Sequence, residues 1–310
     1  RRDSNLVFLE ETLFEGRVRI NLSGDFHHYR RHASLDDRSQ KITSGSGGAF
    51  LHPTHTFKQD PLPGGHTLRA SYPDVATSRR LAWGNLLFIR HCPTFGVMTG
   101  MLYLIVGWNL LGGLQGYQRG DLWTTSVEIA TATLRSPSAF TTIVLALLGF
   151  VVFTDTHKTW YRFFGGLSHG LSHIVAALMI GWLMGLVADT AGLGFGGLAH
   201  VGLTLVALFL GGWLVGSLVM GLYLLISVNL YGRHTTEAFS GLSIADYKQF
   251  LRIVVGRDGG LTIYPIALDR VPRRWKPDPG AARDQPRFLP DDPDPRVRPR
   301  LIEAPIVVPP

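Results

Sequence analysis

The chain has 310 residues, of which 45% are hydrophobic, and its 30 lysines and arginines outnumber its 23 acidic residues to give a net charge of +7. The apolar residues are concentrated between residues 94 and 230, as in membrane proteins, whereas the basic residues lie in the flanks. We interpret the charge as lipid-facing and cytoplasmic, and no nucleic-acid partner is expected, because no basic patch is interleaved with aromatic residues. The single cysteine, Cys92, excludes an internal disulfide.

The first expected elements are an amphipathic helix over residues 4–14 and a strand over residues 18–22. The strand leads into Ser23-Gly24-Asp25-Phe26-His27-His28, and a glycine turn after a strand commonly presents ligands, because glycine lets the backbone bend. Asp25 and His27 share one side of an extended chain. Their side chains are typical ligands of Mn, Fe or Zn, but two residues cannot hold a metal alone. The pair is therefore either part of a larger metal site or a satisfied polar turn.

A second polar segment follows a short strand expected over residues 41–44. It reads Gly45-Ser46-Gly47-Gly48 and continues through Phe50 to His52 and His55. A glycine-rich loop after a strand lets backbone N–H groups approach an anion closely. The alternative is an ordinary surface loop with two exposed histidines.

The stretches SGDFHHYRR and KITSGSGGAFLHPTH together resemble the closing part of the catalytic domain of membrane-anchored bacterial calcineurin-like metallophosphoesterases. The last metal motif of that superfamily is Gly-His-x-His, and Gly24-Asp25-Phe26-His27 matches it with Asp in place of the first histidine. The resemblance implies His27, and less closely Asp25, as ligands in a centre of two divalent metal ions (Mn, Fe or Zn). For a phosphate ester substrate it implies further roles around the metals, namely His28 as a candidate catalytic or neighbouring residue, and Arg30, His52 and His55 as phosphate contacts.

The earlier motifs of the superfamily, Asp-x-His, Gly-Asp-x-x-Asp and Gly-Asn-His, are not found in their expected order. Asp155-Thr156-His157 has the composition of the first, but it follows the last motif and an apolar run, so we interpret it as a loop. The resemblance therefore predicts a mixed fold in a portion of a longer protein, inactive alone. Its expected parts are the end of a four-layer α/β phosphoesterase domain (1–73), an interfacial linker (74–93), a transmembrane domain (94–231) and a cytoplasmic, β-containing tail (232–310).

Residues 55–74 are rich in proline and glycine and are expected to form an irregular linker. Residues 76–91 mix arginines with large apolar residues. This pattern fits either an interfacial helix with its arginines at the lipid headgroups or a helix packed on the soluble domain.

Four apolar stretches are expected to span the bilayer, at about residues 94–114, 138–154, 165–187 and 198–230. The last could instead be a hairpin turning at Gly211-Gly212, but an open turn in lipid is costly, so one long helix is favoured. With four spans the positive-inside rule places both ends of the chain in the bacterial cytoplasm, which predicts a multi-pass protein of the inner membrane.

His169 and His173 lie four residues apart, on one face of the third expected span, and His200 lies near the start of the next. Ionisable residues inside a membrane indicate function by default, such as haem ligation or a proton relay. The second hypothesis is accordingly a non-enzymatic transport or redox protein. The structural alternative is that helix neighbours satisfy these histidines, beside the small residues that favour helix packing.

The residues after the spans predict a helix over 244–250, followed by a hairpin of strands 250–255 and 261–266 around Gly256-Arg257-Asp258-Gly259-Gly260. Beyond Pro272 the chain is rich in Pro, Arg and Asp, and is expected to be extended and loosely held. Residues 301–308 are apolar enough to add a final edge strand.

Overall fold

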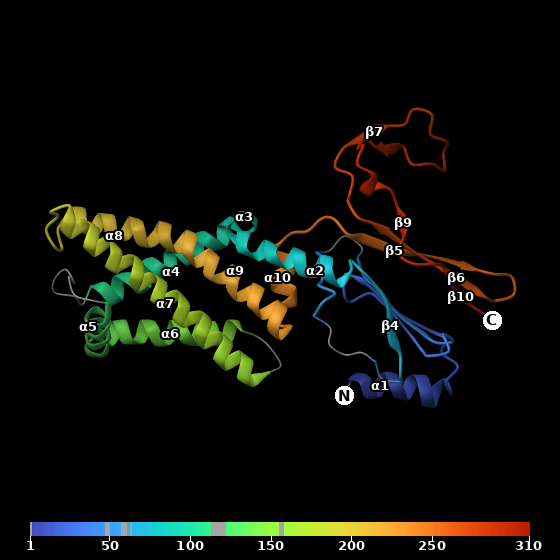
Figure 1. The fold of residues 1–310 in the computed structure, drawn as a ribbon, viewed down its shortest axis with the longest axis horizontal. Helices are drawn as coiled ribbons and strands as arrows, with labels where there is room; N and C mark the ends of the chain where they lie inside the picture. Colours follow the sequence, from blue (N-terminus) through green and yellow to red (C-terminus); the bar gives the residue numbers. More distant parts are fainter. Residues whose placement is uncertain (1, 47–49, 57–60, 63, 113–121, 155–157) are drawn as a thin grey trace. The chain divides into compact units, whose positions relative to one another are not determined.

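A computed structural model describes residues 2–46, 50–56, 61–62, 64–112, 122–154 and 158–310. The chain contains both sheets and helices and forms two compact units (Figure 1). Residues 1–83 and 235–310 form one, called here the sheet unit, and residues 84–234 form the other, called the helical unit.

The first sheet of the sheet unit has the strand order β1-β3-β2-β4, with β1 and β3 parallel and the other neighbours antiparallel. Two of its strands, β1 and β3, lie where the sequence predicted strands, whereas β2 was not predicted and β4 replaces part of the expected irregular linker. Their bounds are Ile20–Ser23 (β1), Tyr29–Ala33 (β2), Gln40–Ser44 (β3) and Thr67–Tyr72 (β4).

The N-terminal helix begins as α1 (Arg2–Val7) and continues as a π-helical segment, η1 (Phe8–Leu13), as the apolar spacing predicted. It is tied to the first sheet by Glu10, which accepts hydrogen bonds from the Nζ of Lys41 at 2.8 Å and from the Nδ2 of Asn21 at 3.4 Å. The ion pair is largely shielded from solvent, so it stabilises the helix on the sheet more than an exposed pair would.

The second sheet has the order β10-β6-β5, with β9 also pairing with β6. The predicted hairpin and edge strand are confirmed. The helix predicted over residues 244–250 is wrong, because β5 already begins at Lys248, paired with Leu268, and the nearby helix is α10 (Thr235–Gly241). The strands are β5 (Lys248–Val255), β6 (Leu261–Leu268), β9 (Arg300–Leu301) and β10 (Ile306–Val308).

The core of the sheet unit joins the two sheets, and thereby the two ends of the chain. Its buried residues are Tyr29, Ile42 and Tyr72 from the first sheet and Ile263, Ala267, Ile306 and Val308 from the second. Glu303, beside β10, accepts hydrogen bonds from the Tyr29 hydroxyl at 2.6 Å and from the Arg31 Nε and Nη2 at 2.9 and 2.6 Å. Burial and the Glu303 carboxylate together raise the pKa of Tyr29 above its ordinary value.

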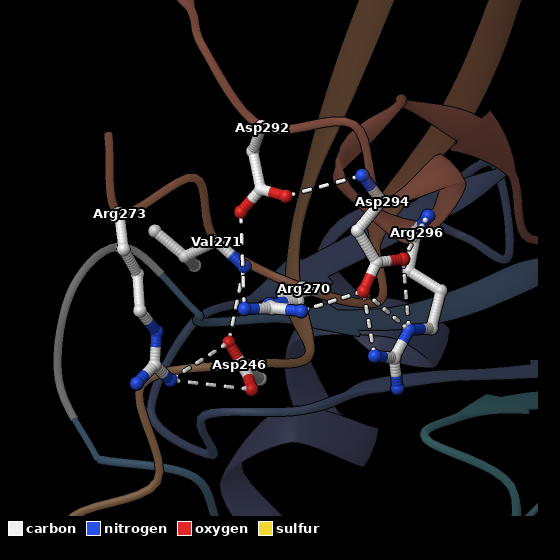
Figure 2. Close-up of polar contacts among 7 residues, drawn as sticks. All are labelled: Asp246, Arg270, Val271, Arg273, Asp292, Asp294 and Arg296. Carbon is white, nitrogen blue, oxygen red and sulfur yellow. Dashed lines mark hydrogen bonds and ion pairs between the residues drawn. The ribbon is translucent and has the colours of Figure 1, made fainter. Parts of the chain in front are cut away.

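The segment after β6 contains the short strands β7 (Trp275–Pro277) and β8 (Phe288–Pro290) and a 3₁₀ turn, η5 (Pro295–Val297). The segment is largely exposed, but ion pairs hold its base. Figure 2 shows Arg270 reaching Asp294, at 2.6 Å between Nη1 and Oδ2, and Asp246 accepting from the backbone N–H of Val271 at 3.0 Å. The expected loose tail is therefore anchored at its base.

The helices from residue 75 onward lie close to the apolar stretches of the sequence. They are α2 (Val75–Ala82), the 3₁₀ segment η2 (Trp83–Leu87), α3 (Phe88–His91), α4 (Pro93–Leu111), α5 (Leu122–Arg135), α6 (Pro137–Phe153), α7 (Thr159–Thr190), α8 (Leu198–Gly211), the π-helical segment η3 (Gly212–Gly216), α9 (Ser217–Ile226) and the π-helical segment η4 (Ser227–Tyr231).

Three helices among the described residues are long and apolar enough to cross a membrane: Pro93–Leu111, Thr159–Thr190 and Leu198–Tyr231. The last one is continuous, which confirms one long helix over a hairpin at Gly211-Gly212. The stretch 138–154 differs from prediction, because α6 reaches spanning length only together with α5, and that pair is bent by 102°. Pro137 explains the bend, since the residue before a proline avoids helical backbone angles, and Ser136 is extended with φ −106° and ψ 106°.

Candidate functional site

The candidate site lies where two parallel strands end. Gly24-Asp25-Phe26-His27 follows β1, and Gly45 follows β3 at the same edge of the sheet. The two loops touch, because a side chain at Gly45 would overlap the backbone carbonyls of Gly24 and Phe26. Ligands commonly bind at the carboxyl ends of parallel strands. The sequence-predicted loop residues 47–49 lie outside the described residues.

His27 is held by the backbone of the second loop. Its Nδ1 lies 2.9 Å from the carbonyl oxygen of Phe50, and its ring packs edge-on against the Phe50 ring. A carbonyl oxygen can only accept, so Nδ1 carries the proton and the lone pair of the neutral ring is on Nε2. Metal-binding histidines are typically oriented in this way, with the other ring nitrogen donating to a carbonyl or carboxylate.

His52 has a different role from His27, although the two ring centroids are only 4.6 Å apart. Its Nδ1 accepts the backbone N–H of His27 at 3.0 Å, and its Nε2 lies 3.5 Å from the hydroxyl of Thr236. Since both ring nitrogens are engaged, His52 positions the His27 loop. Burial, and then the neighbouring His27, lower the pKa of His52, whereas Asp25 opposes the shift. Asp25 itself is exposed.

His28 and Arg30 point into the protein. His28 is 1% exposed and Arg30 is 6% exposed. Burial, with a smaller effect of the Arg30 charge, lowers the pKa of His28 to about 3. His28 is therefore neutral at physiological pH. The roles expected for His28 and Arg30 in the site stay predictions.

His55 is bound to α2. Its Nδ1 lies 2.7 Å from the hydroxyl of Ser78, and the same hydroxyl oxygen accepts the backbone N–H of Thr54 at 2.9 Å. The hydroxyl of Ser78 can donate to Nδ1 of His55 or accept from it, so this contact is compatible with either tautomer of His55. The structure thus brings His27 and His52 together and connects His55 to a helix. The partners Phe50, Ser78 and Thr236 were not predicted, and nothing in the local sequence marks them.

A complete metal site is not assembled from the part of the chain that the structure describes. Within it, no group of three or more His, Cys, Asp or Glu residues could hold a metal ion. Nε2 of His27 has no hydrogen-bond partner among the residues that the structure describes, which fits a metal ligand, whereas the engagement of both nitrogens of His52 does not.

The second set of candidate histidines is brought together only in part. The Nε2 atoms of His169 and His173 are 3.1 Å apart inside the helical unit, where both residues are buried. His200 is separate from this contact: it lies at the start of α8, and its Nδ1 accepts the N–H of Gly196 at 3.1 Å.

Comparisons of the chain with models of protein families, with curated proteins and with solved structures find no match.

Proposed function

We propose that this chain is part of a membrane-anchored, metal-dependent phosphoesterase, in which His27 and Asp25 contribute to the metal site. The observation that supports the proposal is the tautomer of His27, whose Nδ1–H donates to the Phe50 carbonyl and leaves the Nε2 lone pair available. Two further observations are consistent with the proposal. His27 lies at the ends of two parallel strands, and the chain has apolar helices that could anchor the domain in a bilayer.

The proposed site needs further ligands, because Asp25 and His27 supply at most two donors and a dinuclear centre needs more. When bound, two divalent ions would polarise a phosphoryl oxygen and lower the pKa of a coordinated water. The chain itself would contribute orientation: Phe50 fixes the His27 ring, and His52 fixes the backbone N–H of His27. His28, kept neutral by burial, would add no positive charge next to the metals.

The test uses the encoded protein at full length, purified in detergent, with a generic phosphodiester as substrate. We expect His27→Ala to lose bound metal and turnover together, because a direct ligand is lost. Asp25→His, which restores the usual motif, should keep metal and some activity. His28→Ala should lose about 10–100-fold in rate, as is typical of residues that support a ligand. Elemental analysis and turnover are measured on the same samples.

His66→Ala is the matched control, because His66 is also a buried histidine of the sheet unit but bonds to Ser39 instead, at 3.1 Å. It should retain metal. If His27→Ala keeps its metal while His28→Ala loses it, the assignment of ligands is wrong by one residue. If the native protein binds no divalent metal, the proposed function is wrong.

A further inference from the structure

The buried histidines of the helical unit belong to a chain of hydrogen bonds. The Tyr103 hydroxyl on α4 lies 3.1 Å from Nδ1 of His173 on α7, and Nε2 of His173 lies 3.1 Å from Nε2 of His169. All three side chains are almost fully buried, at 1%, 2% and 3% exposure. From these contacts we propose that Tyr103, His173 and His169 form a relay for protons in the interior of the helical unit. The inference is independent of the proposed phosphoesterase function.

The distance between the two imidazoles requires a hydrogen atom or a metal ion between the facing nitrogens. Two nitrogen lone pairs facing each other at 3.1 Å repel, so either a proton or a metal ion lies between them. Two protein nitrogens alone are too few for a stable metal site, and no third His, Cys, Asp or Glu of the described part of the chain is close enough to join them. An N–H···N hydrogen bond between the two rings is therefore the arrangement that these contacts favour.

Every group in the chain can both donate and accept, so two proton arrangements fit the same heavy-atom positions. In the first, Tyr103 donates to Nδ1 of His173, His173 donates through Nε2 to Nε2 of His169, and His169 holds its proton on Nδ1. A proton arriving at the Tyr103 oxygen moves the Tyr103 proton to His173, moves the Nε2 proton of His173 to His169, and releases the Nδ1 proton of His169. One proton enters, one leaves, and every hydrogen bond is kept in the reverse direction.

The surroundings keep the relay dry, and a cavity lies beside each end, with Nδ1 of His169 itself buried and without a hydrogen-bond partner among the described residues. The Phe150 ring stacks on His173 and meets His169 edge-on, with centroid distances of 4.9 and 4.7 Å. A cavity of about 10 Å³, near the minimum for one water, touches Tyr103 and His173. At the other end a mainly apolar groove of about 650 Å³ is lined by His169 and includes the hydroxyl groups of Tyr161, Ser168, Ser172, Tyr223 and Ser227.

Tyr223 extends the polar chain toward the end of the helical unit. Its ring stacks on that of His169 at 4.0 Å, and its hydroxyl lies 2.9 Å from Nε2 of His234 and 3.1 Å from the hydroxyl of Thr154. The stacking contact transfers no proton, so the groove beside His169 has to connect the two parts. At the other end of the relay, glycine permits the packing of Tyr103, since a side chain at Gly212 would overlap it.

The test reconstitutes the full chain in vesicles that contain a pH-sensitive dye and carry a potassium conductance to balance charge. We expect the native chain to dissipate a pH gradient faster than protein-free vesicles. Tyr103→Phe, which keeps the ring and removes the hydroxyl, and His173→Gln should both fall to the protein-free rate. His200→Gln, a histidine of the same unit outside the relay, should retain the native rate. A native rate equal to that of empty vesicles, or an unchanged rate in Tyr103→Phe, would overturn the proposal.

A second measurement requires no variant. In the native chain with ¹⁵N-labelled histidine, magnetic resonance should detect coupling between the two Nε2 atoms across the shared proton. Absence of this coupling overturns the relay. So does a transition metal that copurifies in about equal amount with the native chain and is lost in His169→Gln, because the pair is then a metal site.

Discussion

His27 and His52 of the sheet unit and His173 of the helical unit are held by opposite kinds of partner. In the sheet unit, His27 donates to a backbone carbonyl and His52 accepts a backbone N–H, and neither of these backbone groups can change its role. In the helical unit, His173 is held by a phenol and by another imidazole, which can each donate or accept. Fixed partners select one tautomer and so decide which lone pair faces outward, as a ligand needs. Partners that can reverse leave two tautomers available, as a relay needs.

In the sheet unit, the carboxylate of Glu303 binds Tyr29 and Arg31, which are far from it in sequence. Substitution of Glu303 should have the largest effect on stability. Glu303→Gln weakens the bonds to Tyr29, which is fully buried, and to Arg31, which is partly buried with Glu303. Hydrogen bonds to charged groups contribute about 1.5–3 kcal/mol, so we expect a loss in that range in urea unfolding of the sheet unit. Glu15→Gln, in an exposed pair with Arg17, is the control and should change little. Equal effects would contradict the role given to Glu303.

The backbone approach that fixes the His27 loop is tested by two neighbouring glycines. Gly45→Ala forces a side chain against the carbonyls of Gly24 and Phe26, and overpacking of this kind costs about 1–3 kcal/mol. Gly24→Ala meets no atom closer than 3.9 Å and should be tolerated. Thermal unfolding of the two variants is the measurement. A Gly45→Ala protein as stable as Gly24→Ala would show that the two loops are not in contact.

The neutral state of His28 predicts a dependence of stability on pH. The pKa of His28 is lowered from 6.5 to about 3 in the folded protein, so between these values the unfolded chain binds more protons. The free energy of unfolding should therefore fall as the pH falls through this window, by at most about 1.4 kcal/mol per pH unit from this group. His28→Gln should have a shallower slope, whatever its stability at neutral pH. The same slope in both proteins would mean that His28 is accessible to protons when folded.

The sequence predicted elements that carry a local signal and missed those defined by distant partners. The apolar runs marked α4, α7 and the helix over Leu198–Tyr231, and the glycines between β5 and β6 marked the hairpin. Strand β2 was missed because Arg30 and His32 gave it no apolar alternation, yet both are buried. The burial of this strand depends on residues that are remote in sequence, such as Glu303, which accepts a hydrogen bond from Arg31.

The candidate site was predictable to the same extent. The glycine turn and the histidine spacing drew attention to His27 and to the His169–His173 pair. The tautomer of His27 depends on Phe50, the place of His52 depends on Thr236, and the relay depends on Tyr103. None of these partners has a sequence pattern, because hydrogen bonds between distant segments leave none.

The discontinuity of the sheet unit limits how the chain can be threaded through a bilayer. The chain leaves this unit after Trp83 and rejoins it at Thr235, and the two segments share one core. A polypeptide that starts and finishes on the same side of a membrane must cross it an even number of times. In the part of the chain that the structure describes, three helices satisfy the length requirement by themselves, which is an odd number. If these three helices cross a bilayer, an even count would need the bent α5–α6 pair as a fourth crossing, which its length and composition allow, with Pro137 at the corner of a broken span.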